Sequence, residues 1–309
     1  MEKLFKLKEH GTDVKTEIIA GITTFLAMAY ILAVNPSYLG GIDGMSAGAV
    51  FSATAISAGI ATLCMAFFAN YPVALASGMG LNAFFAFTVC GAMGYSYKVA
   101  LTAVFIEGII FMLLSLFKFR EALVNKIPSN LKFAITAGIG LFIAIIALLN
   151  ANVVVASEST TVALGELSSP TVVLSLVGLL IIGALQHYKV PGGILLGILI
   201  TWVLGIIAQL VGWYVPNPEA GVYSVIPQFS LSSFEAPKMF QFDFGFIAKN
   251  VPAFILIVFT FLYTDIFDTV GTLIGVAEKG KLLDKDGSLP NATGALMADA
   301  VGTVVGACF

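Results

Sequence analysis

The chain has 309 residues, of which 59% are hydrophobic and 11% are charged, and its mean hydropathy is +0.99. These values lie outside the usual range of soluble domains and predict a polytopic membrane protein. The apolar runs are continuous rather than alternating, which excludes a transmembrane β-barrel and favours helical spans. A net charge of −3 offers no basic surface to a nucleic-acid partner.

Apolar runs of spanning length follow one another along the chain and predict nine membrane spans. The runs are 18–36, 46–69, 72–90, 98–117, 131–150, 171–187, 191–211, 251–277 and 292–309. Twelve of the 15 Lys and Arg residues fall in connections on the same side as the amino terminus, which predicts a cytoplasmic amino terminus. No cleavage site follows the charged start before Ile18, so we expect the amino terminus to be retained.

Two segments differ from a plain span. The run 72–90 begins at Pro72 and carries Gly78 and Gly80, so its first half is not expected to be continuous helix. Such a break at membrane depth must face protein or a water-filled cavity. The connection 212–250 is polar and contains several prolines, which predicts an external loop with an interfacial helix.

Residues 259–276 read FTFLYTDIFDTVGTLIGV, an apolar run that contains Asp265 and Asp268. On a helix these carboxylates share one face with Thr272, and the apolar opposite face is predicted to contact lipid. Ionised carboxylates inside a membrane are costly unless they are paired or hydrated, so they typically mark a path for ions, protons or substrate. The alternative is that a carboxylate, Asp265 above all, only caps a helix or accepts a backbone hydrogen bond.

The surroundings of Asp268 favour a role in binding and proton coupling. Its own span contains no cation, since the next one along the chain is Lys279, and a buried carboxylate without a cation can take up a proton. A half-helix that begins near Gly78 would direct backbone N–H groups into the cavity, and Asn82 would add an amide one turn later. These groups suit a neutral planar ligand or an anion. Alternatively, Asn82 only joins two helices and Thr272 only bonds its own backbone.

The remaining unusual residues are predicted to be structural. Glu107 and Asp299 lie within apolar runs and are expected to make hydrogen bonds that support packing. The three cysteines, Cys64, Cys90 and Cys308, lack paired spacing, which argues against a disulfide framework and a metal site. No metal and no other cofactor is expected.

Three long stretches together resemble one known family. They read GTDVKTEIIAGITTFLAMAYILAVNPSYL, ALASGMGLNAFF and DIFDTVGTLIGVAEKGKLLDKDGSLPNATGALMADAVGTVVGACF. They are similar to the adenine/guanine/hypoxanthine permeases, the AzgA-like branch of the nucleobase–cation symporter 2 (xanthine/uracil permease) family. The similarity runs along essentially the whole chain.

The resemblance implies an all-α membrane transporter of fourteen spans, built from two inverted seven-span repeats that form a core domain and a gate domain. Residues 1–130 would then be spans 1–4 of the core, and residues 131–211 spans 5–7 of the gate. Residues 212–250 would be the external loop, and residues 251–309 spans 8 and 9 of the core. Spans 10–14 would be missing, so the chain is expected to be truncated.

The resemblance also implies the site residues. Asp268 is expected to hydrogen-bond the nucleobase, with Thr272 one turn below it and Asn82 as the polar residue of span 3. The break in the run 72–90, and not the resemblance, adds Gly78 and Gly80 at the start of the half-helix to the same predicted substrate site. Asp268 is the first candidate for proton coupling, and Asp265, in the same motif, is the second.

The predicted function is import of a purine nucleobase (guanine, hypoxanthine or adenine) across the cell membrane by proton symport through alternating access. The preferred purine, the choice between proton and sodium, and a homodimeric state stay open. An anion transporter or channel of the same architecture is the alternative. An intramembrane enzyme is disfavoured because a single D-x-x-D motif stands alone.

Overall fold

The structure, a computed structural model, describes residues 5, 7–8, 11–116, 129–157, 159–190, 192–217, 224–226, 235–280, 282 and 289–309. The chain divides into two compact units, one formed by residues 1–139 and 234–309 and the other by residues 140–233. This division lies close to the boundaries expected for core and gate domains, an assignment that stays a prediction.

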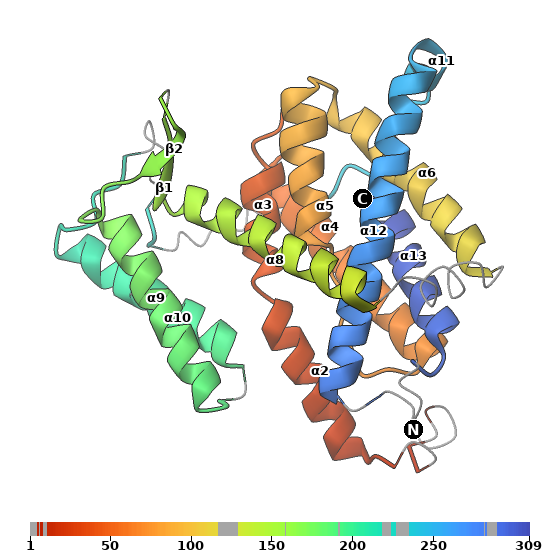
Figure 1. The fold of residues 1–309 in the computed structure, drawn as a ribbon, viewed down its shortest axis with the longest axis horizontal. Coiled ribbons are helices and arrows are strands. Elements are labelled where there is room, and N and C mark those ends of the chain that lie inside the picture. Colours follow the sequence, from red (N-terminus) through yellow and green to blue (C-terminus); the bar gives the residue numbers. More distant parts are fainter. Residues whose placement is uncertain are drawn as a thin grey trace. The chain divides into compact units, whose positions relative to one another are not determined.

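The first unit is helical. Its helices are α2 (Val14–Met28), α3 (Ile31–Leu39), α4 (Ala47–Cys64), α5 (Met79–Ala83), α6 (Tyr97–Leu116), α11 (Gly245–Lys249), α12 (Val251–Gly280) and α13 (Ala292–Cys308) (Figure 1). Two π-helical segments, η1 (Met65–Ala69) and η2 (Phe84–Ala92), continue α4 and α5. Side chains that the sequence places before α2 and α4 cap them, since Asp13 and Ser46 accept hydrogen bonds from the backbone N–H groups of Thr16 and Ala49.

The second unit contains a helix pair and a hairpin. Helix α8 (Ser129–Asn150) includes the boundary between the units, and α9 (Pro170–His187) packs against α10 (Gly193–Leu210). Strands β1 (Val154–Ser157) and β2 (Thr161–Leu164) pair antiparallel, with Val154 opposite Leu164. The sequence analysis did not predict this hairpin, which lies in a connection between two apolar runs.

Helices occur in all nine predicted apolar runs. Among the described residues, six helical runs are long and apolar enough to cross a membrane. They are Val14–Leu39, Ala47–Ala69, Tyr97–Leu116, Pro170–His187, Gly193–Leu210 and Val251–Glu278, and the runs Met79–Ala92 and Ala292–Cys308 are shorter. A multi-pass membrane protein is therefore supported, whereas nine spans and the fourteen-span inverted-repeat fold stay predictions.

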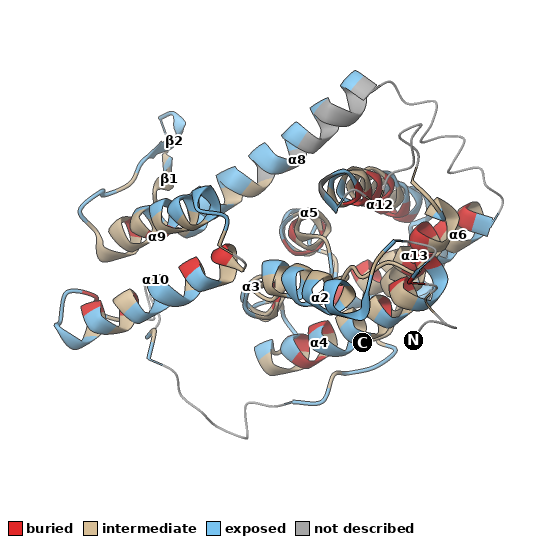
Figure 2. Cartoon of the chain, turned by 90° about the horizontal axis from the view of Figure 1, so that it is seen from below, coloured by how far each residue is buried: buried red, intermediate tan, exposed pale blue. Residues whose placement is uncertain are grey.

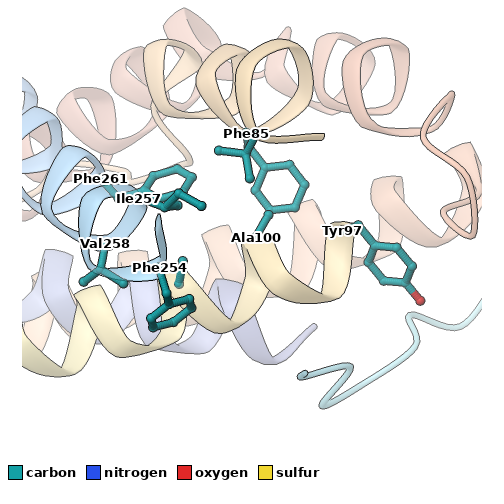
Figure 3. Packing of buried hydrophobic residues seen from close by; sticks show 9 residues of the cluster. Phe85, Tyr97, Ala100, Phe254, Ile257, Val258 and Phe261 are labelled. Atoms are coloured by element: carbon teal, nitrogen blue, oxygen red, sulfur yellow. The ribbon is translucent and has the colours of Figure 1, made fainter. Parts of the chain in front are cut away.

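The core of the first unit lies where α6 packs against both α12 and α13, whose buried residues are red in Figure 2. Figure 3 shows α12 side chains beside those of α6 and Phe85 of η2. This cluster consists of Phe85, Val89, Tyr97, Ala100, Ala103, Phe254, Ile257, Val258 and Phe261. Small residues allow α13 to approach α6, because a Cβ built on Gly108 would lie 2.8 Å from Val304 Cγ2.

One expectation about α12 was wrong. The face opposite the aspartates was expected to contact lipid, yet Ile266, Val270 and Leu273 are all buried. Leu273 belongs to a second cluster, with Met65 of η1 and Phe111 of α6, whose other buried residues come from η1 and α13. Protein rather than lipid therefore covers this part of α12. The exposed large apolar side chains of α12 lie nearer its start, at Val251, Ile255, Leu256, Phe259 and Tyr263.

The predicted external loop is described only in part. Residues 218–223 and 227–234 lie outside the described residues, and the part before α12 contains the five-residue helix α11. The interfacial position of a helix in this loop stays a prediction.

Candidate functional site

The candidate site begins at a break in the helical structure. The chain leaves η1 at Asn70, which has φ 60°, runs without helix as far as Gly78, and enters α5 at Met79. The prediction that the first half of 72–90 is not continuous helix is therefore confirmed. In Figures 1 and 2, α5 lies between α3 and α12, and it contacts both helices.

Side chains of neighbouring helices hydrogen-bond the backbone of this non-helical segment. The N–H of Ala74 donates to Thr24 Oγ1 at 3.1 Å, and the N–H of Leu75 donates to Thr62 Oγ1 at 2.9 Å. The hydroxyl of Thr62 also reaches the carbonyl oxygen of Leu75, at 3.3 Å. Threonines of α2 and α4 thus replace the missing helical hydrogen bonds, which is the condition for irregular backbone at membrane depth.

The segment is also held at its start. Asn291, the residue before α13, donates from Nδ2 to the carbonyl oxygens of Phe68 and Ala69, at 2.8 and 3.2 Å. These are carbonyls of η1, and short π-helical segments are frequent at functional sites. The start of α13 therefore fixes the place where the broken segment begins.

Asp268 of α12 meets the start of α5. A Cβ built on Gly78 would lie only 2.5 Å from Asp268 Oδ2, so the carboxylate occupies the space that any other residue at 78 would fill. Asp268 is half-buried, and Gly78 provides no side-chain cap to α5. The structure thus brings together two predicted site residues that are far apart in the sequence.

Asn82 lies one turn into this helical run and is half-buried. Its Nδ2 donates to Asn35 Oδ1 at 2.6 Å and to Ser77 Oγ at 3.2 Å. Asn35 belongs to α3 and is 3% exposed. Asn82 therefore does join two helices, as the alternative interpretation held, and it does so beside the Gly78 and Asp268 pair.

The other predicted residues differ in their surroundings. Thr272 lies one turn after Asp268 and is exposed. Gly80 has open space at its Cα. Apart from its chain neighbours and the backbone of its own helix, no atom would lie within 4 Å of a Cβ built there. Neither residue contradicts a ligand site at the start of α5.

Asp265 lies in a different environment from Asp268. It is buried, and its Oδ1 lies 3.4 Å from Thr269 Oγ1. Thr269 Oγ1 also lies 2.5 Å from Asp299 Oδ2, and because a hydroxyl has a single proton, the shorter contact is the better hydrogen bond. The sequence analysis treated Asp299 as structural and did not place it near Asp265. Thr269, the residue that follows Asp268 on α12, was the residue that could have suggested a polar partner on another helix.

The described part of the chain holds no group of three His, Cys, Asp or Glu side chains suited to a metal ion. The groups at the candidate site are one carboxylate, amide and hydroxyl side chains, and the backbone at the start of α5.

A sequence model described as Permease family matches residues 15–309. The chain belongs to this permease family. Guanine/hypoxanthine permease PbuO of Bacillus subtilis (strain 168) is 44% identical over 313 residues, and Adenine permease AdeQ of Escherichia coli (strain K12) is 42% identical over 307 residues. Guanine/hypoxanthine permease PbuG of Bacillus subtilis (strain 168) is 41% identical over 317 residues.

Each of these three alignments covers 99% of this chain and 68%, 66% and 69% of the respective relative. The chain thus spans about two thirds of the length of these permeases. Membership of the permease family indicates a transporter rather than an enzyme, and the resemblance seen in the three sequence stretches is confirmed.

Proposed function

We propose that the protein imports purine nucleobases and that the base binds between Asp268 and the start of α5. The relatives that carry adenine or guanine/hypoxanthine in their names support a purine as substrate. The observation that carries the proposal is the close approach of Asp268 Oδ2 to Gly78, where a built Cβ would lie 2.5 Å from this oxygen. It places a carboxylate beside the first backbone N–H groups of a helical run, so that one ligand can reach both.

The chemistry of these groups matches a purine. An ionised carboxylate only accepts hydrogen bonds, whereas the N–H groups at a helix start only donate them. A purine carries both ring N–H donors and ring nitrogen or carbonyl acceptors in one plane. Thr272, one turn from Asp268, and Gly80, with open space beside it, complete the proposed substrate site together with Asn82.

Proton symport is the proposed source of energy. When a carboxylate binds a proton, it changes from an acceptor only into a group that also donates, so its contact with a base N–H changes. We assign this coupling to Asp268 first and to Asp265 second. Because Thr269 lies within hydrogen-bonding distance of Asp265 and of Asp299, protonation of either carboxylate would alter the contacts between α12 and α13.

Alternating access completes the proposed mechanism. All the proposed site residues belong to the first unit of the chain. We assign residues 1–130 and 251–309 to a core that carries the base and residues 131–211 to a gate. Movement of core against gate would expose the site first to one side of the membrane and then to the other. We place the protein in the cell membrane with a cytoplasmic amino terminus.

The test is uptake of radiolabelled adenine, guanine and hypoxanthine by cells that lack their own purine permeases and express the full-length protein. Asp268→Asn should lower the initial uptake rate at least about tenfold, because a hydrogen bond to a charged group contributes about 1.5–3 kcal/mol. Asp13→Asn is the matched control, since Asp13 is the exposed cap of α2 and asparagine caps equally well. Normal uptake by Asp268→Asn would contradict the site. No purine uptake by the well-expressed parent would favour an anion substrate.

A further inference from the structure

Four polar side chains form one hydrogen-bond network behind the candidate site. Asn35 of α3 donates from Nδ2 to Thr54 Oγ1 of α4 at 3.1 Å and to Ser77 Oγ at 2.7 Å. Its Oδ1 accepts from Asn82 Nδ2 at 2.6 Å. Asn35 and Thr54 are buried, with 3% and 6% of their surface exposed, whereas Ser77 is exposed. The network therefore runs from the interior of the first unit to the start of α5.

The direction of every hydrogen bond in this network follows from its buried end. The hydroxyl of Thr54 donates its single proton to the carbonyl oxygen of Val50, at 2.7 Å. Thr54 Oγ1 can then only accept toward Asn35, so the Asn35 amide must turn its NH₂ group to Thr54. An amide NH₂ has two hydrogens, and the second one of Asn35 goes to Ser77.

Counting hydrogens and lone pairs in the same way also determines the hydrogen bonds at the exposed end of the network, at Ser77 and Asn82. Asn82 uses one amide hydrogen for Asn35 Oδ1 and the other for Ser77 Oγ. Ser77 Oγ accepts from both asparagines, which occupies its two lone pairs and leaves its own proton free to point away from them. With both Asn82 hydrogens engaged, Asn82 Oδ1 is left to act as an acceptor.

Resting on the proposed function, we infer that Asn35 is a positioning residue that sets the hydrogen-bonding pattern of the substrate site. Asn35 makes Ser77 a donor and Asn82 an acceptor toward the ligand. These two residues precede and follow Gly78 in the chain, and Asp268 approaches Gly78. A ligand must then offer N–H groups to Asp268 and Asn82 and an acceptor, a ring nitrogen or carbonyl oxygen, to Ser77. A planar nitrogen heterocycle with both kinds of group fits this pattern. A ligand that meets Ser77 with an N–H, or Asn82 with a lone pair, does not.

The decisive variant is Asn35→Asp, which keeps the size of the side chain and removes both of its donors. The new carboxylate would draw the Ser77 proton toward itself, so that Ser77 no longer donates to the ligand. We expect KM for the transported purine to rise about tenfold or more, with protein at the cell surface unchanged. A hydrogen bond lost at a ligand site changes affinity by roughly this factor.

Analogues identify the hydrogen bond that is lost. The probes are a series of purines in which one ring nitrogen is replaced by C–H or the 6-substituent is removed, each competing with the labelled base. One analogue, which lacks the acceptor opposite Ser77, should bind about tenfold less well than its parent to the wild type. That difference should vanish in Asn35→Asp and in Ser77→Ala, for the same analogue. The double variant should be no worse than Asn35→Asp alone, since both changes remove one contact.

Several outcomes would overturn the inference while leaving the proposed function intact: a wild-type analogue profile in Asn35→Asp, loss of discrimination at different analogues in the two variants, or additive effects. Absence of any purine transport by the wild type would instead overturn both proposals.

If Asn35→Asp fails to reach the membrane, Thr54→Val carries the test, because it removes the acceptor that orients Asn35. It should weaken discrimination against the same analogue, and retained discrimination would refute the role. Ser52→Ala is the control, since buried Ser52 of α4 donates only to its own helix, at Gly48, and should leave KM unchanged.

Discussion

Asp268 and Gly78 meet so closely that the carboxylate oxygen Oδ2 lies where the side chain of any other residue at position 78 would begin. The two residues come from α12 and from the start of α5, which are far apart in the sequence but contact each other. The geometry of the candidate site therefore depends on a residue that has no side chain. The first prediction tests this dependence.

Gly78→Ala should lower purine uptake by about tenfold or more. The added Cβ would lie 2.5 Å from Asp268 Oδ2, so the carboxylate has to move away from the backbone of α5. Because Gly78 has an ordinary φ of −70°, alanine fits the backbone there, and the effect is steric. Initial rates of uptake, normalised to protein at the cell surface, measure the loss. Gly59→Ala in α4 is the control, since its Cβ would meet nothing within 4 Å, and it should keep wild-type rates. A Gly78→Ala protein that transports normally would contradict the close contact.

Thr269→Val should destabilise the protein, because it removes the hydroxyl that lies between the carboxylates of Asp265 and Asp299. A buried acceptor that loses its donor costs about 1–3 kcal/mol. The apparent melting temperature in detergent should therefore fall by several degrees. Thr260→Val is the matched control on the same helix, because Thr260 is only half-buried and its hydroxyl donates to the carbonyl oxygen of Leu256 in its own helix. Equal melting temperatures for the two variants would show that the hydroxyl of Thr269 has no stabilising role.

The sequence predicted those features of the site that depend on neighbours along the chain. Pro72, Gly78 and Gly80 indicated the break before α5, since proline and glycine act on local backbone conformation. The D-x-x-D motif indicated membrane carboxylates because three residues is nearly one helical turn. Both inferences used spacing within one segment, and the structure agrees with the break and with carboxylates on α12.

The spacing of residues within one segment could not predict contacts between different helices. Asn35 reaches Asn82 from α3, and Asp299 reaches Thr269 from α13, so both depend on packing that a single helical pattern does not contain. The same limit explains the error on α12, where Leu273 was expected to face lipid and packs against protein instead. An apolar face looks alike in sequence whether it contacts lipid or other helices, because both environments are apolar.

Gly108→Val should weaken the packing of α6 against α13. A Cβ at this position would lie 2.8 Å from Val304 Cγ2 and 3.1 Å from the backbone nitrogen of Val304. Overpacking of this kind typically costs about 1–3 kcal/mol, so the apparent melting temperature should fall. Adding Val304→Ala should restore only part of the loss, since it removes the methyl contact but not the backbone one. Full restoration, or no loss at all in the single variant, would contradict this packing.

Asn291 combines two properties that different substitutions can separate. It adopts φ 51°, a left-handed conformation that asparagine and glycine tolerate, and it donates to the carbonyl oxygens of Phe68 and Ala69. Asn291→Gly should lose only the hydrogen bonds, whereas Asn291→Ala should lose them and strain the backbone by a further ~1 kcal/mol.

We therefore expect stability to fall in the order wild type, Asn291→Gly, Asn291→Ala, measured as apparent melting temperature. Purine uptake should fall in both variants, because the hydrogen bonds from Asn291 fix the end of η1 from which the chain runs to Gly78. Asn152→Gly is the control, since Asn152 also has a positive φ, of 56°, but lies outside the first unit. If both Asn291 variants transported purines at the wild-type rate, the start of α13 would not help to position the candidate site.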